Sequence, residues 1–177
     1  MPSPPREGKP PAIQLDYAGS TLFIGVGATL ATDLWAIVRG RLFGVPAPDW
    51  GLVGRWFGYM ARGRFRHERI ADAKPVRGER VIGWAAHYLI GIAFAGALLA
   101  ICGLGWTRQP TLAPAMLLGI GTVAAPFLLM QPGMGAGVAA SRTPRPDAAR
   151  LQSLVTHAVF GLGLYAAGFL LSLLPGE

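Results

Sequence analysis

The sequence predicts an all-α polytopic membrane protein: four transmembrane helices in a bundle, plus an interfacial amphipathic helix in the first cytoplasmic loop. Of the 177 residues, 52% are hydrophobic and only 14% are charged, whereas a soluble domain averages about 25% charged residues. The apolar residues form long runs, because no Asp, Glu, Lys or Arg lies within residues 81–107, 109–141 or 151–176. These features argue against a compact soluble enzyme or a disordered chain. A single cysteine, Cys102, excludes an intramolecular disulfide framework.

Four segments are long enough to cross about 30 Å of hydrocarbon, which takes about 20 apolar residues. They are residues 21–38, 81–104, 111–130 and 151–174. Arg39 and Arg41 follow the first segment, whereas a signal peptide carries positive charge before its apolar run, so we expect this span to be retained. Residues 1–18 form a proline-rich tail, expected to be disordered, and residues 19–177 form a single transmembrane domain.

Charge asymmetry orients the bundle. Ten Lys or Arg lie in residues 39–80 and three lie in residues 131–150, whereas the N-terminal tail holds two and the C-terminal tail none. The positive-inside rule makes the two richer loops cytoplasmic, so both termini are expected to face outward. The net charge of +7 is explained by arginines that flank apolar runs and meet anionic lipid headgroups, and no nucleic-acid partner is expected.

The first cytoplasmic loop contains an amphipathic segment, about residues 49–69. Asp49 is suited to cap a helix in which Val53, Trp56, Phe57 and Met60 share one apolar face. Such a helix lies in the membrane interface or packs beneath the bundle as a plug. A glycine-rich segment follows the third span but lacks a P-loop ending. The candidate contacts to anionic lipid or phosphate are Arg55, Arg62, Arg64, Arg66, Arg142 and Arg145.

Three ionisable residues lie inside the spans: Asp33, His87 and His157. Counted from the cytoplasmic ends, Asp33 lies about 7 Å deep and both histidines about 9 Å deep. Small residues share their helical faces, which favours inward positions where helices approach closely. Such a group could bind a divalent metal, relay protons or hydrogen-bond as a structural lock. The two histidines could also ligate haem, so metal and cofactor are left open.

A catalytic alternative pairs Ser153 or Ser141 with His157 and Asp33. No nucleophile-elbow pattern surrounds either serine, so the sequence leans against an enzyme. His67, within the basic loop, could fold back under the bundle as an additional ligand.

Several motifs occur in an order that resembles a bacterial membrane family defined only as domain of unknown function 2938. They are GATLATDLW, GRWFGYMARGRFRH, GWAAHYLIG, PTLAPA, TVAAPFLLMQPGMGAGVAASRTPRP and LVTHAVFGLGLY. The resemblance implies a bacterial inner-membrane protein with about four helices, which places the outward-facing termini in the periplasm, and it supplies no reaction. Asp33, His67, His87 and His157 match motif positions, whereas Tyr59 stands where the family pattern often has His. Tyr59 is therefore a further candidate ligand.

The leading functional hypothesis is a small membrane protein whose inward Asp33, His87 and His157 handle a proton, an ion or a small ligand. The alternative is a structural or assembly subunit in which the same residues lock helices together. Four helices are few for alternating access, so a transport role would call for a homo-oligomer or a membrane partner protein.

Overall fold

The computed structural model describes residues 16–174, and within that range every regular element is helical. The expected disordered tail, residues 1–18, lies outside the described residues except for its last three. In chain order the α-helices are α1 (Tyr17–Phe43), α2 (Trp50–Met60), α3 (Glu79–Cys102), α4 (Leu112–Gly121), α5 (Gln131–Met134) and α6 (Pro146–Ser172). Short 3₁₀ turns lie at Ile70–Asp72, Leu104–Thr107 and Val138–Ala140, and a π-helical turn lies at Pro126–Met130.

Four helical segments are long and apolar enough to cross a membrane: Tyr17–Phe43, Glu79–Cys102, Leu112–Met134 and Pro146–Ser172. They contain or closely overlap the four predicted spans. The first is longer than predicted because Asp16 caps it, its carboxylate accepting from the Gly19 N–H at 2.7 Å, and because it runs on to Gly44. Gly44 has a φ of 63°, a left-handed conformation that glycine adopts without steric cost.

The third span is not one uniform helix. Pro126 begins a π-helical turn in which the Gln131 N–H bonds to the Pro126 carbonyl. Proline lacks an N–H and its ring clashes with the preceding turn, and a local π-turn is one way to absorb that disruption. The backbone therefore widens between α4 and α5, on the side of the bundle where the candidate site lies.

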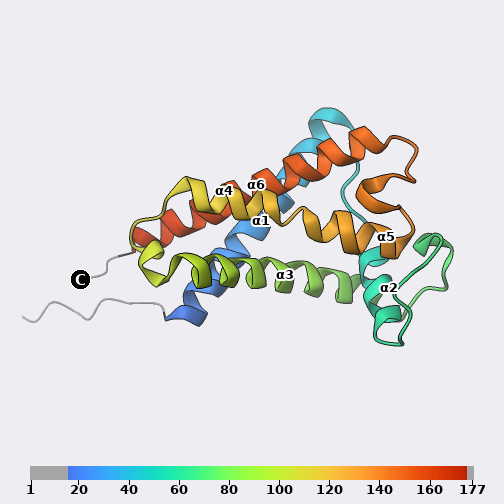
Figure 1. The fold of residues 1–177 in the computed structure, drawn as a ribbon, viewed down its shortest axis with the longest axis horizontal. Helices are drawn as coiled ribbons and strands as arrows, with labels where there is room; N and C mark the ends of the chain where they lie inside the picture. Colours follow the sequence, from blue (N-terminus) through green and yellow to red (C-terminus); the bar gives the residue numbers. More distant parts are fainter. Residues whose placement is uncertain (1–15, 175–177) are drawn as a thin grey trace, which may run out of the picture.

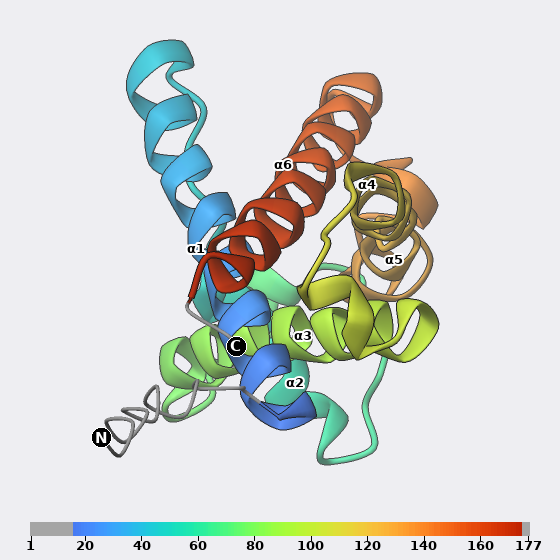
Figure 2. The same ribbon diagram turned by 90° about the vertical axis from the view of Figure 1, so that its left-hand side faces the viewer.

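The helices cross rather than run parallel. Helix α1 packs against α3 and α6, α4 packs against α6, and α2 packs across the first turns of α3. Figure 1 shows both ends of the described chain at the left, with α2, α5 and their loops at the right. In Figure 2, α1 and α6 cross near the terminal ends and diverge toward the loop end.

Glycines make these crossings close. A Cβ on Gly25 would collide with the Ile92 backbone of α3, and one on Gly91 would collide with Thr29 of α1. Likewise a Cβ on Gly119 of α4 would collide with the backbone of Gly161 in α6. Small residues permit this approach between membrane helices, which confirms the predicted small-residue faces.

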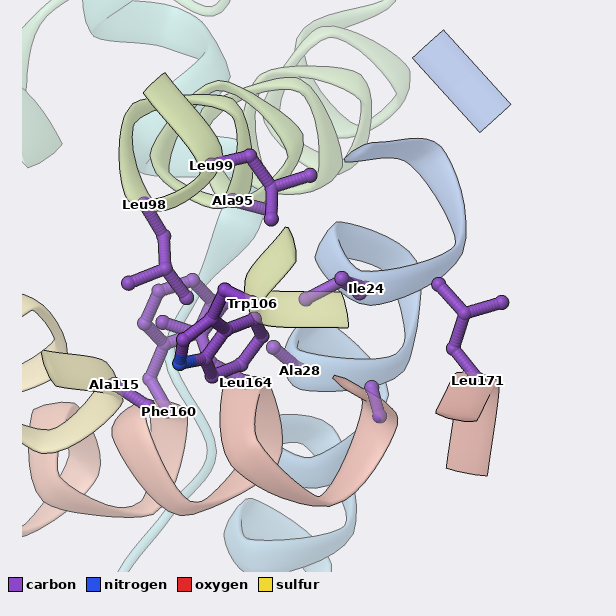
Figure 3. Packing of buried hydrophobic residues seen from close by; sticks show 11 residues of the cluster. Ile24, Ala28, Ala95, Leu98, Leu99, Trp106, Ala115, Phe160, Leu164 and Leu171 are labelled. Carbon is purple, nitrogen blue, oxygen red and sulfur yellow. The ribbon is translucent and has the colours of Figure 1, made fainter. Parts of the chain in front are cut away.

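The buried apolar cluster occupies the half of the bundle nearer the termini. Figure 3 shows Trp106 wedged between α1, α3 and α6, beside Ile24, Leu98 and Leu164. Many large apolar side chains lie on the outside instead, among them Leu34, Ile101 and Leu117. An apolar exterior around a small core is what a lipid-facing bundle requires.

Candidate functional site

Asp33 joins α1 to α3. Its Oδ1 lies 3.0 Å from the Nε2 of His87, and its Oδ2 accepts from the Tyr88 hydroxyl at 2.8 Å. The side chains of His87 and Asp33 are only 16% and 20% exposed. Because the carboxylate accepts from two neighbouring residues of α3, it orients the His87 ring as well as pairing with it.

Trp50 covers the other side of this pair. Its ring stacks on His87 with centroids 3.9 Å apart and planes 24° apart, and Trp84 meets the imidazole edge-on. Trp50 is held by the start of α2, where Asp49 caps the helix by accepting from the Gly51 N–H at 2.8 Å. The predicted capping role of Asp49 is confirmed.

Helix α2 sits against α3 through a second glycine crossing. A Cβ on Gly54 would collide with the Glu79 carbonyl, and a Cβ on Gly83 would collide with the Trp50 carbonyl. Val53 and Trp56 are buried on the face that the sequence predicts to be apolar. Within the described residues α2 packs against α3, and this contact is compatible both with an interfacial position and with a plug beneath the bundle.

His157 lies on α6 and bonds to α4. Its Nδ1 is 2.9 Å from the Thr122 hydroxyl and 3.3 Å from the Gly119 carbonyl, while the Thr122 hydroxyl donates to that same carbonyl at 2.6 Å. A carbonyl oxygen only accepts, and Thr122 has one hydrogen. The tautomer that fits both contacts is the neutral ring with its proton on Nδ1 and a lone pair on Nε2.

Both histidines line one cavity of about 450 Å³. Its wall is almost wholly apolar and is built by α1, α2, α3, the π-turn and α6. The lining residues are Thr29, Thr32, Trp50, Val53, Trp56, Phe57, Met60, His87, Ile90, Gly91, Phe94, Ala125, Pro126, Leu129, Met130, Thr156, His157 and Phe160. Asp33 lies behind His87 and is not part of the wall.

The three predicted residues are therefore brought together only in part. Asp33 and His87 are in direct contact, and His157 faces the same cavity from a different helix with its own partners. Among residues 16–174 no group of three or more His, Cys, Asp or Glu side chains is placed to hold a metal ion. Metal binding through an assembled Asp–His–His set does not fit this geometry.

A family model described as "Protein of unknown function (DUF2938)" matches residues 22–171. The chain belongs to the DUF2938 family. The match spans α1 to α6 and includes the cavity wall. No curated protein and no solved structure matches the chain.

The two additional ligand candidates of this DUF2938 protein lie elsewhere. The side chain of His67 is buried with its ring edge against Tyr59 (centroids 4.9 Å apart), and the backbone N–H of His67 donates to the Gly133 carbonyl at 2.9 Å. The Tyr59 hydroxyl donates to the Lys74 carbonyl at 3.0 Å. Neither residue lines the cavity. His67 lies on the loop that docks against α5, and Tyr59 contacts it from the last turn of α2.

Arg55 is engaged within the DUF2938 chain. Its Nε and Nη2 donate to the two carboxylate oxygens of Glu79 at 2.8 Å each, and Nη1 donates to the carbonyl of Ala73 at 2.9 Å. Hydrogen bonding to Glu79 raises the pKa of Arg55 above its ordinary value. The lipid-contact hypothesis therefore does not extend to Arg55, and it rests on side chains that are exposed: Arg62, Arg64, Arg66, Arg142 and Arg145.

Among the described residues, the structure shows no contact that would support the catalytic alternative. In the described part of the chain neither Ser141 nor Ser153 hydrogen-bonds to His157, whose ring proton is directed to α4.

Trp50, Tyr88 and Thr122 are site residues that the sequence did not single out. Tyr88 adjoins His87 and Trp50 follows the cap residue, but nothing local to Thr122 indicates that it meets His157 across 35 residues.

Proposed function

We propose that this protein binds a small, largely apolar molecule that enters from the bilayer, in the cavity lined by His87 and His157. In this proposal the two imidazoles are the polar contacts and Asp33 orients His87. The observation that carries the proposal is the cavity itself: about 450 Å³, within the range of small-molecule sites, with an apolar wall and two convergent imidazoles.

The cavity argues against histidines that act only as locks. A bundle that needs interhelical hydrogen bonds alone gains nothing from an open volume of this size, because unfilled space forfeits packing contacts. The wall also lacks the several oxygen ligands that Ca²⁺ or Mg²⁺ requires. A neutral apolar ligand is therefore favoured over a hard ion.

The entry route is lateral. Ile90 of α3 and Leu129 of the π-turn both line the cavity, and they are 40% and 67% exposed on the apolar exterior. Helices α3 and α4 touch much less than the other neighbouring pairs. A molecule dissolved in the hydrocarbon thus reaches the histidines between α3 and the third span without crossing the polar loops. We further propose an inner-membrane position with the basic loops cytoplasmic and in contact with anionic lipid.

Photoaffinity labelling tests the proposal. An alkylphenol that carries a diazirine is added to the protein in detergent, and labelled residues are mapped by mass spectrometry with and without excess unlabelled alkylphenol. We expect competable labels on the cavity face of α2 and near Phe160.

Two neighbouring alanines supply the variant and its control. Ala125 lines the cavity, whereas Ala124 is exposed on the exterior. Ala125→Phe should abolish the competable labels and Ala124→Phe should retain them. Labelling confined to the exterior, unchanged in a folded Ala125→Phe protein, would overturn the proposal.

A further inference from the structure

The lining side chains of the cavity offer more hydrogen-bond acceptors than donors. The inference drawn from this imbalance rests on the function proposed above. We infer that the site selects apolar molecules that donate hydrogen bonds, of the class of phenols and hydroquinones, over the matching ketones and ethers. The inference comes from an account of which polar hydrogens in the wall are already used inside the protein.

His157 presents an acceptor. Its Nδ1 proton is directed to Thr122 and Gly119 of α4, so Nε2 is a lone-pair nitrogen in the neutral ring. Among the described residues Nε2 has no hydrogen-bond partner, and this nitrogen is not fully buried. Since His157 lines the cavity, this nitrogen is available to a ligand.

His87 presents a second acceptor by the same logic. The Asp33 carboxylate receives the Tyr88 hydroxyl hydrogen on Oδ2 and lies 3.0 Å from the Nε2 of His87 on Oδ1. The neutral tautomer that fits this contact has its proton on Nε2, which donates to Oδ1. The Nδ1 of His87 is then the lone-pair nitrogen, and no hydrogen bond within the described chain occupies it.

The donors of the wall are largely committed. The hydroxyls of Thr29, Thr32 and Thr156 donate to the carbonyls of Gly25, Thr29 and Gln152 in their own helices, at 2.7, 2.7 and 2.9 Å. The indole N–H of Trp56 donates to the Phe65 carbonyl at 2.9 Å. The indole N–H of Trp50 is the one remaining donor among the lining side chains that the structure describes.

The wall therefore offers two imidazole acceptors against one indole donor. A ligand with only carbonyl or ether oxygens would leave both imidazole lone pairs unpaired in an apolar surrounding, which is unfavourable. A carboxylate would meet the same lone pairs with a negative charge and no lining cation to neutralise it. A phenol supplies a donor for one of these acceptors, and a hydroquinone supplies one for each.

Three probes with the same carbon skeleton test this selectivity: an alkylhydroquinone, the matching quinone and the matching dimethyl ether. The hydroquinone is measured anaerobically in the presence of a reductant so that it is not oxidised. Affinity is measured as protection against the diazirine label. We expect the hydroquinone to bind about tenfold more tightly than the ether and the quinone. His157→Phe and His87→Phe should each reduce this preference several-fold, whereas Met130→Leu, another lining position, should preserve it.

The outcomes separate the two proposals. Equal affinity for all three probes, or a preference that survives both histidine substitutions in folded protein, would overturn the donor selectivity while the cavity function stands. Failure of all three probes to protect, in wild-type protein that is folded, would overturn both.

Discussion

Helix α2, which closes one end of the cavity, is joined to α3 by an ion pair. Breaking that pair tests whether the contact between α2 and α3 stabilises the fold. Arg55 of α2 and Glu79 of α3 are joined by two parallel hydrogen bonds of 2.8 Å, and their side chains are 11% and 21% exposed. Glu79 also accepts from the Val76 N–H at 2.8 Å, and Arg55 also donates to loop carbonyls. The pair therefore ties α2, α3 and the intervening loop into one unit.

Substituting Glu79→Leu leaves the Arg55 guanidinium without its charge partner in a largely buried position. Removing one partner of a buried pair costs about 3–5 kcal/mol. Because this pair keeps some exposure, we expect about 3 kcal/mol of lost unfolding free energy. Arg55→Leu should cost a similar amount. The double variant should cost less than the sum of the two, by about 2 kcal/mol, because neither charge is then left unpaired.

The assay is unfolding of the detergent-solubilised protein by titration with sodium dodecyl sulfate, followed by circular dichroism. Arg69 and Asp72 supply the control pair, since they lie 3.7 Å apart with side chains 75% and 66% exposed. Arg69→Gln should cost less than about 1 kcal/mol. A Glu79→Leu protein as stable as Arg69→Gln, or a coupling energy near zero, would refute the reasoning.

Three further outcomes follow from the structure. Gly119→Ala should cost about 2 kcal/mol of unfolding free energy, because the added Cβ meets the Gly161 backbone. Gly121→Ala should have little effect, because its added Cβ meets nothing within 4 Å. Equal effects of the two variants in the same titration would contradict the close crossing of α4 and α6. Burial, and then the positive charge of Arg64, lower the pKa of His67, so the unfolded chain binds its proton more readily than the folded one. This contribution to stability is complete above about pH 6.5 and is lost as the pH falls below it. His67→Leu should therefore lose less stability than wild type between about pH 7.5 and about pH 5.5, and identical losses would count against the effect. A cytoplasmic reporter inserted at Gly63 and a periplasmic reporter fused at Glu177 should both be active, and the reverse pattern would invert the proposed topology.

The spans were predictable because their cause is local. In hydrocarbon every backbone N–H and C=O must be satisfied within the segment, so a long uncharged run forms a helix whatever it packs against. The Asp49 cap is equally local, since a side-chain oxygen reaches an N–H two residues ahead. The break in the third span was not predicted, although Pro126 marks its position.

Asp33, His87 and His157 could be selected from sequence because ionisable groups are costly in a membrane. The sequence could not show that Asp33 and His87 form a hydrogen-bonded pair while His157 has separate partners. Depth along each helix follows from counting residues, whereas rotation about the axis and the distance between helices depend on the partner surfaces. Arg55 shows the same limit, because its face on α2 was visible and its partner Glu79, 24 residues away, was not.

A reader of the sequence alone can predict a helical fold with four membrane-length apolar segments and can mark the ionisable residues whose burial needs a reason. Those properties follow from composition and from hydrogen bonds within each helix. How the helices pack together, by contrast, determines that two histidines face one cavity and that α2 closes it from the loop end. Helix contacts such as Gly25 on Ile92 and Gly54 on Glu79 set those positions. Each depends on two surfaces meeting at backbone distance, and the sequence of either helix specifies only one of them.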